Sequence, residues 1–216
     1  MRDAYSDQLD SIRDDLVTMA QLVRTAVGRA TTALLEGDAA VAEDVISADD
    51  QVDALREKLD ERSFELLSLQ NPVAGDLRML VASLRMVSEF ERMGDLAVHV
   101  AKIARLRTPD IAVPDEMVPT IARMAAVAEV MVGKVEYVIA QSDVAAALEL
   151  EDVDQEMDRL RRSSFRELLG SEWKHGVEPA VDIALLGRYY ERIADHAVSV
   201  ARRVIFLVTG EQPVAP

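Results

Sequence analysis

The chain has 216 residues, of which half are apolar, so it can bury one large hydrophobic core or two smaller ones. It contains no cysteine, which excludes disulfide bridges, thiolate zinc sites and a cysteine nucleophile. With 39 acidic and 24 basic residues its formal net charge is −15, so nucleic acid is not expected as a partner, whereas cations or a basic protein surface are.

Apolar residues recur every three or four positions over long stretches, and no segment keeps the two-residue alternation of a half-buried strand. The first of these stretches runs from Leu9 through Leu16 and Val23 to Ala33. Glycine and proline residues divide the chain into six expected helices, at roughly 5–36, 38–69, 73–107, 116–141, 143–169 and 178–208. The sequence therefore predicts an all-α protein.

The chain shows no sign of a signal peptide or a membrane span. Its first residues, MRDAYSDQLDS, are acidic and polar, and its longest apolar runs fall far short of the roughly 20 residues that cross a bilayer. Together with the absence of cysteine, this composition favours a location in the cytoplasm.

The two halves of the chain resemble each other on either side of a proline-rich stretch near 108–119. ADDQVDALRE (48–57) aligns with VDQEMDRLRR (153–162), and FERMGDLAVHV (90–100) aligns with YERIADHAVSV (190–200). This internal repeat predicts two tandem, pseudo-symmetric three-helix bundles built from up-down helices. We expect the first bundle in residues 1–108 and the second in 115–210.

Each half carries two acidic pairs with four-residue spacing, one on its second helix and one on its third. Every pair begins one step past an apolar core position, so its side chains are expected at the edge of the packed face. Neighbouring helices could then bring four carboxylates together in each bundle. The candidate metal ligands are Asp49, Asp53, Glu91 and Asp95 in the first bundle and Asp154, Asp158, Glu191 and Asp195 in the second.

Most acidic pairs in so acidic a chain are solvated surface charge, and like charges at this spacing are mildly destabilising. The equivalent pairs on equivalent helices in both halves favour cation binding instead. Ligands that are all hard oxygen atoms suit Mg²⁺, Ca²⁺, Mn²⁺ or ferric iron, and carboxylates can also hold zinc. His99, four residues after Asp95, could extend the first set, whereas Ser199 in the second half could not.

A carboxylate-bridged metal enzyme or a metal-storage protein is the alternative function. Ferritin-like di-metal chemistry uses two Glu-x-x-His motifs, but the chain has a single one, from Glu172 to His175, beside a predicted helix end. Walker, GxSxG and HExxH motifs are also absent, so we do not expect an enzyme.

Four motifs together resemble the PhoU family of phosphate-signalling regulators: ADDQVD, PVAGDLR (72–78), ERMGDLA and YERIADHA. The resemblance extends from Leu9 to Gly210, and the segment from EWKHGV to LVTG looks like that of the actinobacterial members. One departure is that the second half has AVDIA (180–184) where the first has AGDLR (74–78).

The resemblance implies two tandem three-helix bundles whose surface clusters of acidic residues hold iron or zinc, here through the eight carboxylates named above. It also implies an adaptor that links the high-affinity phosphate ABC transporter to a membrane sensor histidine kinase, modulates phosphate uptake and represses the phosphate-starvation response when phosphate is plentiful. Such a protein is cytoplasmic and associates with the membrane through its partners. The sequence leaves a homodimer open.

Overall fold

The computed structural model describes residues 2–70 and 72–211, and within them the chain forms helices and no strands. The six helices are α1 (Arg2–Glu36), α2 (Ala39–Gln70), α3 (Ala74–Arg107), α4 (Val118–Gln141), α5 (Val144–Leu168) and α6 (Val177–Thr209). The predicted all-α fold is confirmed. Most helix ends fall within two residues of their expected positions, and α1 begins three residues earlier.

Side-chain caps mark the starts of α2 and α5. Asp38 accepts hydrogen bonds from the backbone N–H groups of Ala40 and Val41 at the start of α2, and Asp143 accepts one from Ala146 at the start of α5. Gly37, which follows α1, has a positive φ of 67°, a conformation that glycine adopts without strain. Local sequence is therefore sufficient to set the short α1–α2 and α4–α5 connections.

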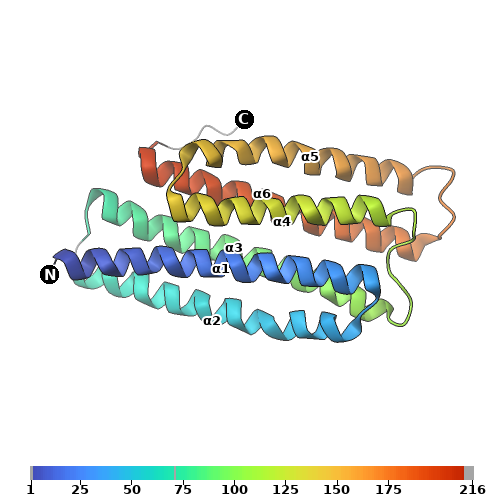
Figure 1. The fold of residues 1–216 in the computed structure, drawn as a ribbon, viewed down its shortest axis with the longest axis horizontal. Helices are drawn as coiled ribbons and strands as arrows, with labels where there is room; N and C mark the ends of the chain where they lie inside the picture. The colour runs from blue at the N-terminus through green and yellow to red at the C-terminus, as the bar shows by residue number, and fades with distance from the viewer. Residues whose placement is uncertain (1, 71, 212–216) are drawn as a thin grey trace.

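Helices α1, α2 and α3 pack on one another as one bundle, and α4, α5 and α6 as a second (Figure 1). The two bundles lie side by side because α1 contacts α4 and α3 contacts α6. Figure 1 shows that α3 and α6 run in opposite directions, as expected for halves related by a pseudo-twofold axis. Among the described residues, α2 and α5 contact only helices of their own bundle.

The buried side chains of all six helices form one continuous hydrophobic core rather than two. Tyr190 of α6 is fully buried, and its hydroxyl lies 2.9 Å from the hydroxyl of Thr31 on α1. The second bundle is thus joined to the first by packing and by a buried hydrogen bond. The internal repeat predicted the two bundles but not the extent of the interface between them.

An ion pair at one end of the α3–α6 interface also joins the bundles. Arg107, at the end of α3, donates to both carboxylate oxygens of Asp182 on α6, at 2.6 and 3.1 Å, and also to Glu178. Asp182 is only 4% exposed. Asp182 belongs to AVDIA, the segment of the second half that differs from AGDLR in the first. The ion pair gives Asp182 a structural role in holding the two bundles together.

No helix in the described part of the chain is both long enough and apolar enough to cross a membrane.

Candidate metal centre

The eight predicted carboxylates lie where the outer helix of each bundle packs on its third helix, α2 on α3 and α5 on α6. Asp49 and Asp53 face the α3 motif that contains Glu91 and Asp95. Asp154 and Asp158 stand in the same relation to the α6 motif that contains Glu191 and Asp195. The two clusters therefore lie on opposite sides of the molecule (Figure 1), and Asp195 of the second also lines the groove between α3 and α6.

In the first cluster the carboxylates are close enough to perturb one another. Burial, followed by the negative charges of Asp95, Asp53 and Glu91, raises the pKa of Asp49 to about 6. The pKa of Glu91 is also raised, first by burial and then by Asp95, although Arg56 opposes the shift. The structure thus brings together the four residues that the sequence proposed, and their charges are incompletely compensated.

A glycine allows Asp49 to approach α3 closely. A Cβ atom added at Gly94 would lie 3.2 Å from Oδ1 of Asp49, tighter than most real contacts. The equivalent residue in the second bundle is Ala194, which is buried beside the second cluster. The ERMGDLA motif therefore supplies both acidic residues and the space into which the α2 carboxylate fits.

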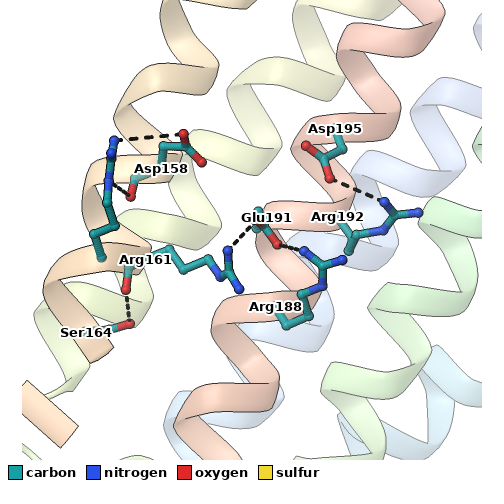
Figure 2. Close-up of polar contacts among 8 residues, drawn as sticks. Asp158, Arg161, Ser164, Arg188, Glu191, Arg192 and Asp195 are labelled. Atoms are coloured by element: carbon teal, nitrogen blue, oxygen red, sulfur yellow. Dashed lines mark hydrogen bonds and ion pairs between the residues drawn. The ribbon is translucent and has the colours of Figure 1, made fainter. Parts of the chain in front are cut away.

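In the second cluster Asp154 has the same electrostatic setting as Asp49. Burial, then the charges of Asp195, Asp158 and Glu191, raise its pKa to about 6. Glu191 differs from Glu91, because Arg161 donates to Oε1 of Glu191 at 2.7 Å and Arg188 donates to its other carboxylate oxygen (Figure 2). Two guanidinium groups therefore occupy both oxygen atoms of a predicted ligand.

This difference between the bundles follows from single positions in the repeat. The counterpart of Arg188 in the first half is Ser88, which cannot neutralise a carboxylate. The counterpart of Arg161 is Arg56, whose Nε lies 3.6 Å from Asp53. In the second bundle, Asp158 pairs with Arg162 at 3.8 Å and Asp195 with Arg192 at 3.4 Å (Figure 2). The first cluster is therefore the less compensated of the two.

The side chains as they stand do not form a coordination shell. Among the described residues, no group of three or more His, Asp or Glu side chains is arranged so that it could hold a metal ion. His99, considered as an additional ligand, bonds through Nδ1 to the backbone oxygen of Asp95 at 2.7 Å, and its ring packs edge-on against Tyr189 of the other bundle. The donor chemistry of the first cluster suits a hard cation, and the metal-ligand assignments remain predictions.

We expect Asp49→Asn to stabilise the metal-free protein at pH 8. The pKa of Asp49 is higher in the folded state than in the unfolded state, so its contribution to stability is present below pH 4 and is lost as the pH rises through about 6. Removing the ionised carboxylate should increase the free energy of unfolding by about 1 kcal/mol at pH 8, since water screens a half-buried group. Urea unfolding in the presence of a chelator measures this gain.

The gain should shrink towards zero as the pH is lowered to 4. Asp154→Asn should behave in the same way, because the pKa of Asp154 is raised to about 6 by an equivalent set of neighbours. A gain that does not depend on pH would show that the amide stabilises the protein for another reason.

The family model described as "PhoU domain" matches this chain twice, over residues 16–104 and 121–204, one match for each bundle. The chain belongs to the PhoU family. This PhoU-family chain is also similar in fold to a solved protein, the PhoU of Pseudomonas aeruginosa, with a TM-score of 0.87, 28% identity, and coverage of 96% of this chain and 100% of that one.

Mycobacterial PhoU proteins are similar to the chain over nearly its whole length. It is 47% identical to the phosphate-specific transport system accessory protein PhoU homolog 2 of Mycobacterium tuberculosis, covering 99% of this chain and 100% of the relative. It is 34% identical to the PhoU homolog of Aquifex aeolicus, covering 94% and 92% of the two chains. The predicted resemblance to actinobacterial PhoU proteins is confirmed.

The relatives carry the names of accessory proteins of a phosphate-specific transport system and not of enzymes, which confirms the prediction that this PhoU-family chain is not an enzyme. The alternative of a carboxylate-bridged metal enzyme is therefore wrong. His175, the histidine of the single Glu-x-x-His motif, is instead paired with Glu116, with its Nε2 3.1 Å from the carboxylate.

The sequence reasoning missed a second set of polar residues, located where α3 and α6 meet. A carboxylate oxygen of Glu89 on α3 lies 2.6 Å from Nδ1 of His196 on α6, across the bundle interface. Both residues line a groove between these two helices, and so do Arg92 and Arg192. The available signal was the arginine that follows the glutamate in both copies of the repeated motif. This arginine could be assigned to a shared groove only once the structure showed that α3 and α6 are neighbours.

Proposed function

We propose that this PhoU-family protein is an accessory component of a phosphate-specific transport system and that it represses the phosphate-starvation response. The observation that carries the proposal is the full-length similarity to proteins named as accessory proteins of such a system, at 43–47% identity in the mycobacterial relatives. Both bundles are covered, so the whole chain, and not one shared domain, supports the comparison.

In this proposal the chain acts as an adaptor between the high-affinity phosphate ABC transporter and a sensor histidine kinase, and so modulates phosphate uptake. When phosphate is plentiful, the adaptor holds the kinase in the state that keeps starvation genes off. The protein works in the cytoplasm and reaches the membrane through these two partners. The continuous core supports an adaptor role, because a rigid pair of bundles keeps surfaces on both halves at a fixed separation.

Deleting the gene tests this function directly. We expect phosphate-scavenging genes to be expressed in phosphate-rich medium in the deletion strain and to be repressed again when the intact gene is restored. Reporter expression from a starvation-induced promoter measures the effect. Unchanged reporter expression in rich phosphate would contradict the proposed repression.

We propose in addition that the carboxylate cluster of the first bundle binds iron or zinc. The raised pKa values of Asp49 and Glu91 support this assignment, because a cation would relieve the repulsion that raises them. Asp53 and Asp95 would complete the ligand set. A bound cation would add a local positive charge and hold α2 on α3, which stabilises the outer helix of that bundle.

For the second bundle we propose weaker binding or none. Arg161 and Arg188 already neutralise Glu191, so a metal would have to displace two guanidinium groups from a residue that is only 8% exposed. If Glu191 stays paired with these arginines, the candidate ligands Asp154, Asp158 and Asp195 lack the fourth carboxylate of their set.

A further inference from the structure

The groove between α3 and α6 is a concentration of positive charge on a strongly acidic protein. Its volume is about 510 Å³, and it is open to solvent. Four arginines line it, against two carboxylates, whereas the whole chain has a net charge of −15. The arginines are Arg85, Arg92, Arg192 and Arg203. Because acidic residues outnumber basic ones in the chain as a whole, an average patch of its surface should be negative. The excess of arginine in the groove therefore requires an explanation.

The two carboxylates of the groove are already bound by cationic or proton-bearing groups. Glu89 pairs with Nδ1 of His196 at 2.6 Å, and Arg203 lies 3.9 Å from its other oxygen. Asp195 pairs with Arg192 at 3.4 Å, in the arrangement shown in Figure 2. His196 is only 7% exposed, so this hydrogen-bonded network is a buried and ordered base of the groove and not a set of mobile surface side chains.

Several donors of the groove are left without a protein acceptor. Arg85 and Arg92 are exposed on α3, and within the described residues no carboxylate lies at ion-pair distance from either. The buried Nε of Arg203 also has no hydrogen-bond partner in the described structure. The hydroxyl groups of Ser88 and Ser199 add neutral donors from the two helices. The unfilled hydrogen-bonding capacity of the groove is therefore that of a donor-rich, cationic site.

The internal repeat explains how the arginines meet. Arg92 and Arg192 each follow the glutamate of the repeated motif, and the antiparallel contact of α3 with α6 brings both to one groove. Guanidinium groups present forked donors that match the oxygen atoms of phosphate. Apart from His196, which is 7% exposed and bound to Glu89, the residues that line the groove include no aromatic side chain, and Leu84 is the single apolar one. The groove therefore offers little to a nucleobase or an apolar peptide anchor.

We propose that the α3–α6 groove is a binding site for a phosphate-type oxyanion, either free inorganic phosphate or the phosphate group of a monoester. Arg85 and Arg92 supply unpaired charge from the first bundle. Arg192, which pairs with Asp195, and Arg203, which lies 3.9 Å from Glu89, add further guanidinium donors from the second. Because both bundles contribute, the bound anion would also link α3 to α6. The site shares Asp195 with the second carboxylate cluster and does not depend on the proposed adaptor role.

The test is a titration of the purified, intact protein with inorganic phosphate at constant ionic strength, followed by backbone amide NMR. We expect saturable shifts centred on α3 and α6 around the groove. Arg85→Gln combined with Arg92→Gln should weaken binding by about tenfold or more, since two charge-assisted contacts are removed. A parallel titration with glycerol 3-phosphate distinguishes the two ligand types. Tighter binding of inorganic phosphate would indicate a site for the free anion, and tighter binding of glycerol 3-phosphate a site for a phosphate monoester.

The matched control is Arg159→Gln combined with Arg166→Gln, which removes the same charge from exposed positions on α5. This variant should keep the affinity of the unmodified protein. Absence of saturable binding by both ligands would overturn the proposal, and so would an equal loss of affinity in the two double variants. Urea unfolding of each variant verifies that it is folded, so a loss of binding can be assigned to the groove.

Discussion

Replacing Tyr190 by alanine is expected to lower the free energy of unfolding by about 3–5 kcal/mol, the range found when large aromatic side chains are removed from cores. Tyr190 is fully buried and its hydroxyl reaches Thr31 of the other bundle, so the cavity would open between the two bundles. The melting temperature should fall by about 10 °C for a chain of this length. Urea and thermal unfolding, followed by circular dichroism, measure both quantities.

Tyr190→Phe is the matched control. It keeps the ring and removes only the hydroxyl, while Thr31 can still donate to the backbone oxygen of Val27 at 2.8 Å. Its effect should therefore be about 1 kcal/mol. Both variants should unfold in a single transition, because the bundles share one core. Two separate transitions, or an alanine variant as stable as the phenylalanine variant, would contradict the shared core.

The second large effect is expected on metal binding. Asp49→Ala combined with Glu91→Ala should lower the affinity of the protein for iron or zinc by about 100-fold or more, because two of four proposed ligands are removed. Elemental analysis of protein purified without a chelator or an affinity tag measures the bound metal. Titration of the metal-free protein with zinc, followed by thermal unfolding, measures the affinity.

The pseudo-symmetry of the chain supplies the control for this experiment. Asp154→Ala combined with Glu191→Ala makes the same change in the second bundle and should leave most of the bound metal in place, because Glu191 is already paired with arginines. Metal content at background level in the unmodified protein would contradict the metal proposal. Equal losses in the two double variants would contradict its assignment to the first bundle.

The helices and the tandem bundles could be predicted because their determinants are local or repeated. The spacing of residues such as Leu16 and Val23 indicates a helix with one buried face, and both are fully buried in the structure. Breakers such as Gly37 mark the helix ends. The alignment of Phe90 with Tyr190 indicated duplication, and both side chains are fully buried at equivalent core positions.

The packing of one bundle on the other could not be predicted in the same way. An apolar stripe specifies that a helix face is buried but not which helix covers it, so the contacts of α1 with α4 and α3 with α6 required the structure. The partner of the buried Asp182 was equally hidden, since Arg107 lies 75 residues away in the sequence.

The sequence predicted which carboxylates lie near one another but not which of them are paired with arginines. Four-residue spacing places Glu91 and Asp95 on one face of α3, and the core pattern places Asp49 opposite them. The same spacing does not predict which arginine side chains reach these carboxylates, whether from the facing helix, as Arg161 does, or from the preceding turn, as Arg188 does. Arg161 and Arg188 therefore distinguish two clusters that look equivalent in the sequence.

The most direct test of the adaptor function is isolation of the tagged, intact protein with its partners from membranes of cells grown at high and at low phosphate. We expect subunits of the phosphate transporter and a sensor histidine kinase to be recovered with it at high phosphate, above the level seen with an unrelated tagged protein. Recovery of neither partner above that level, at either phosphate concentration, would contradict the adaptor function.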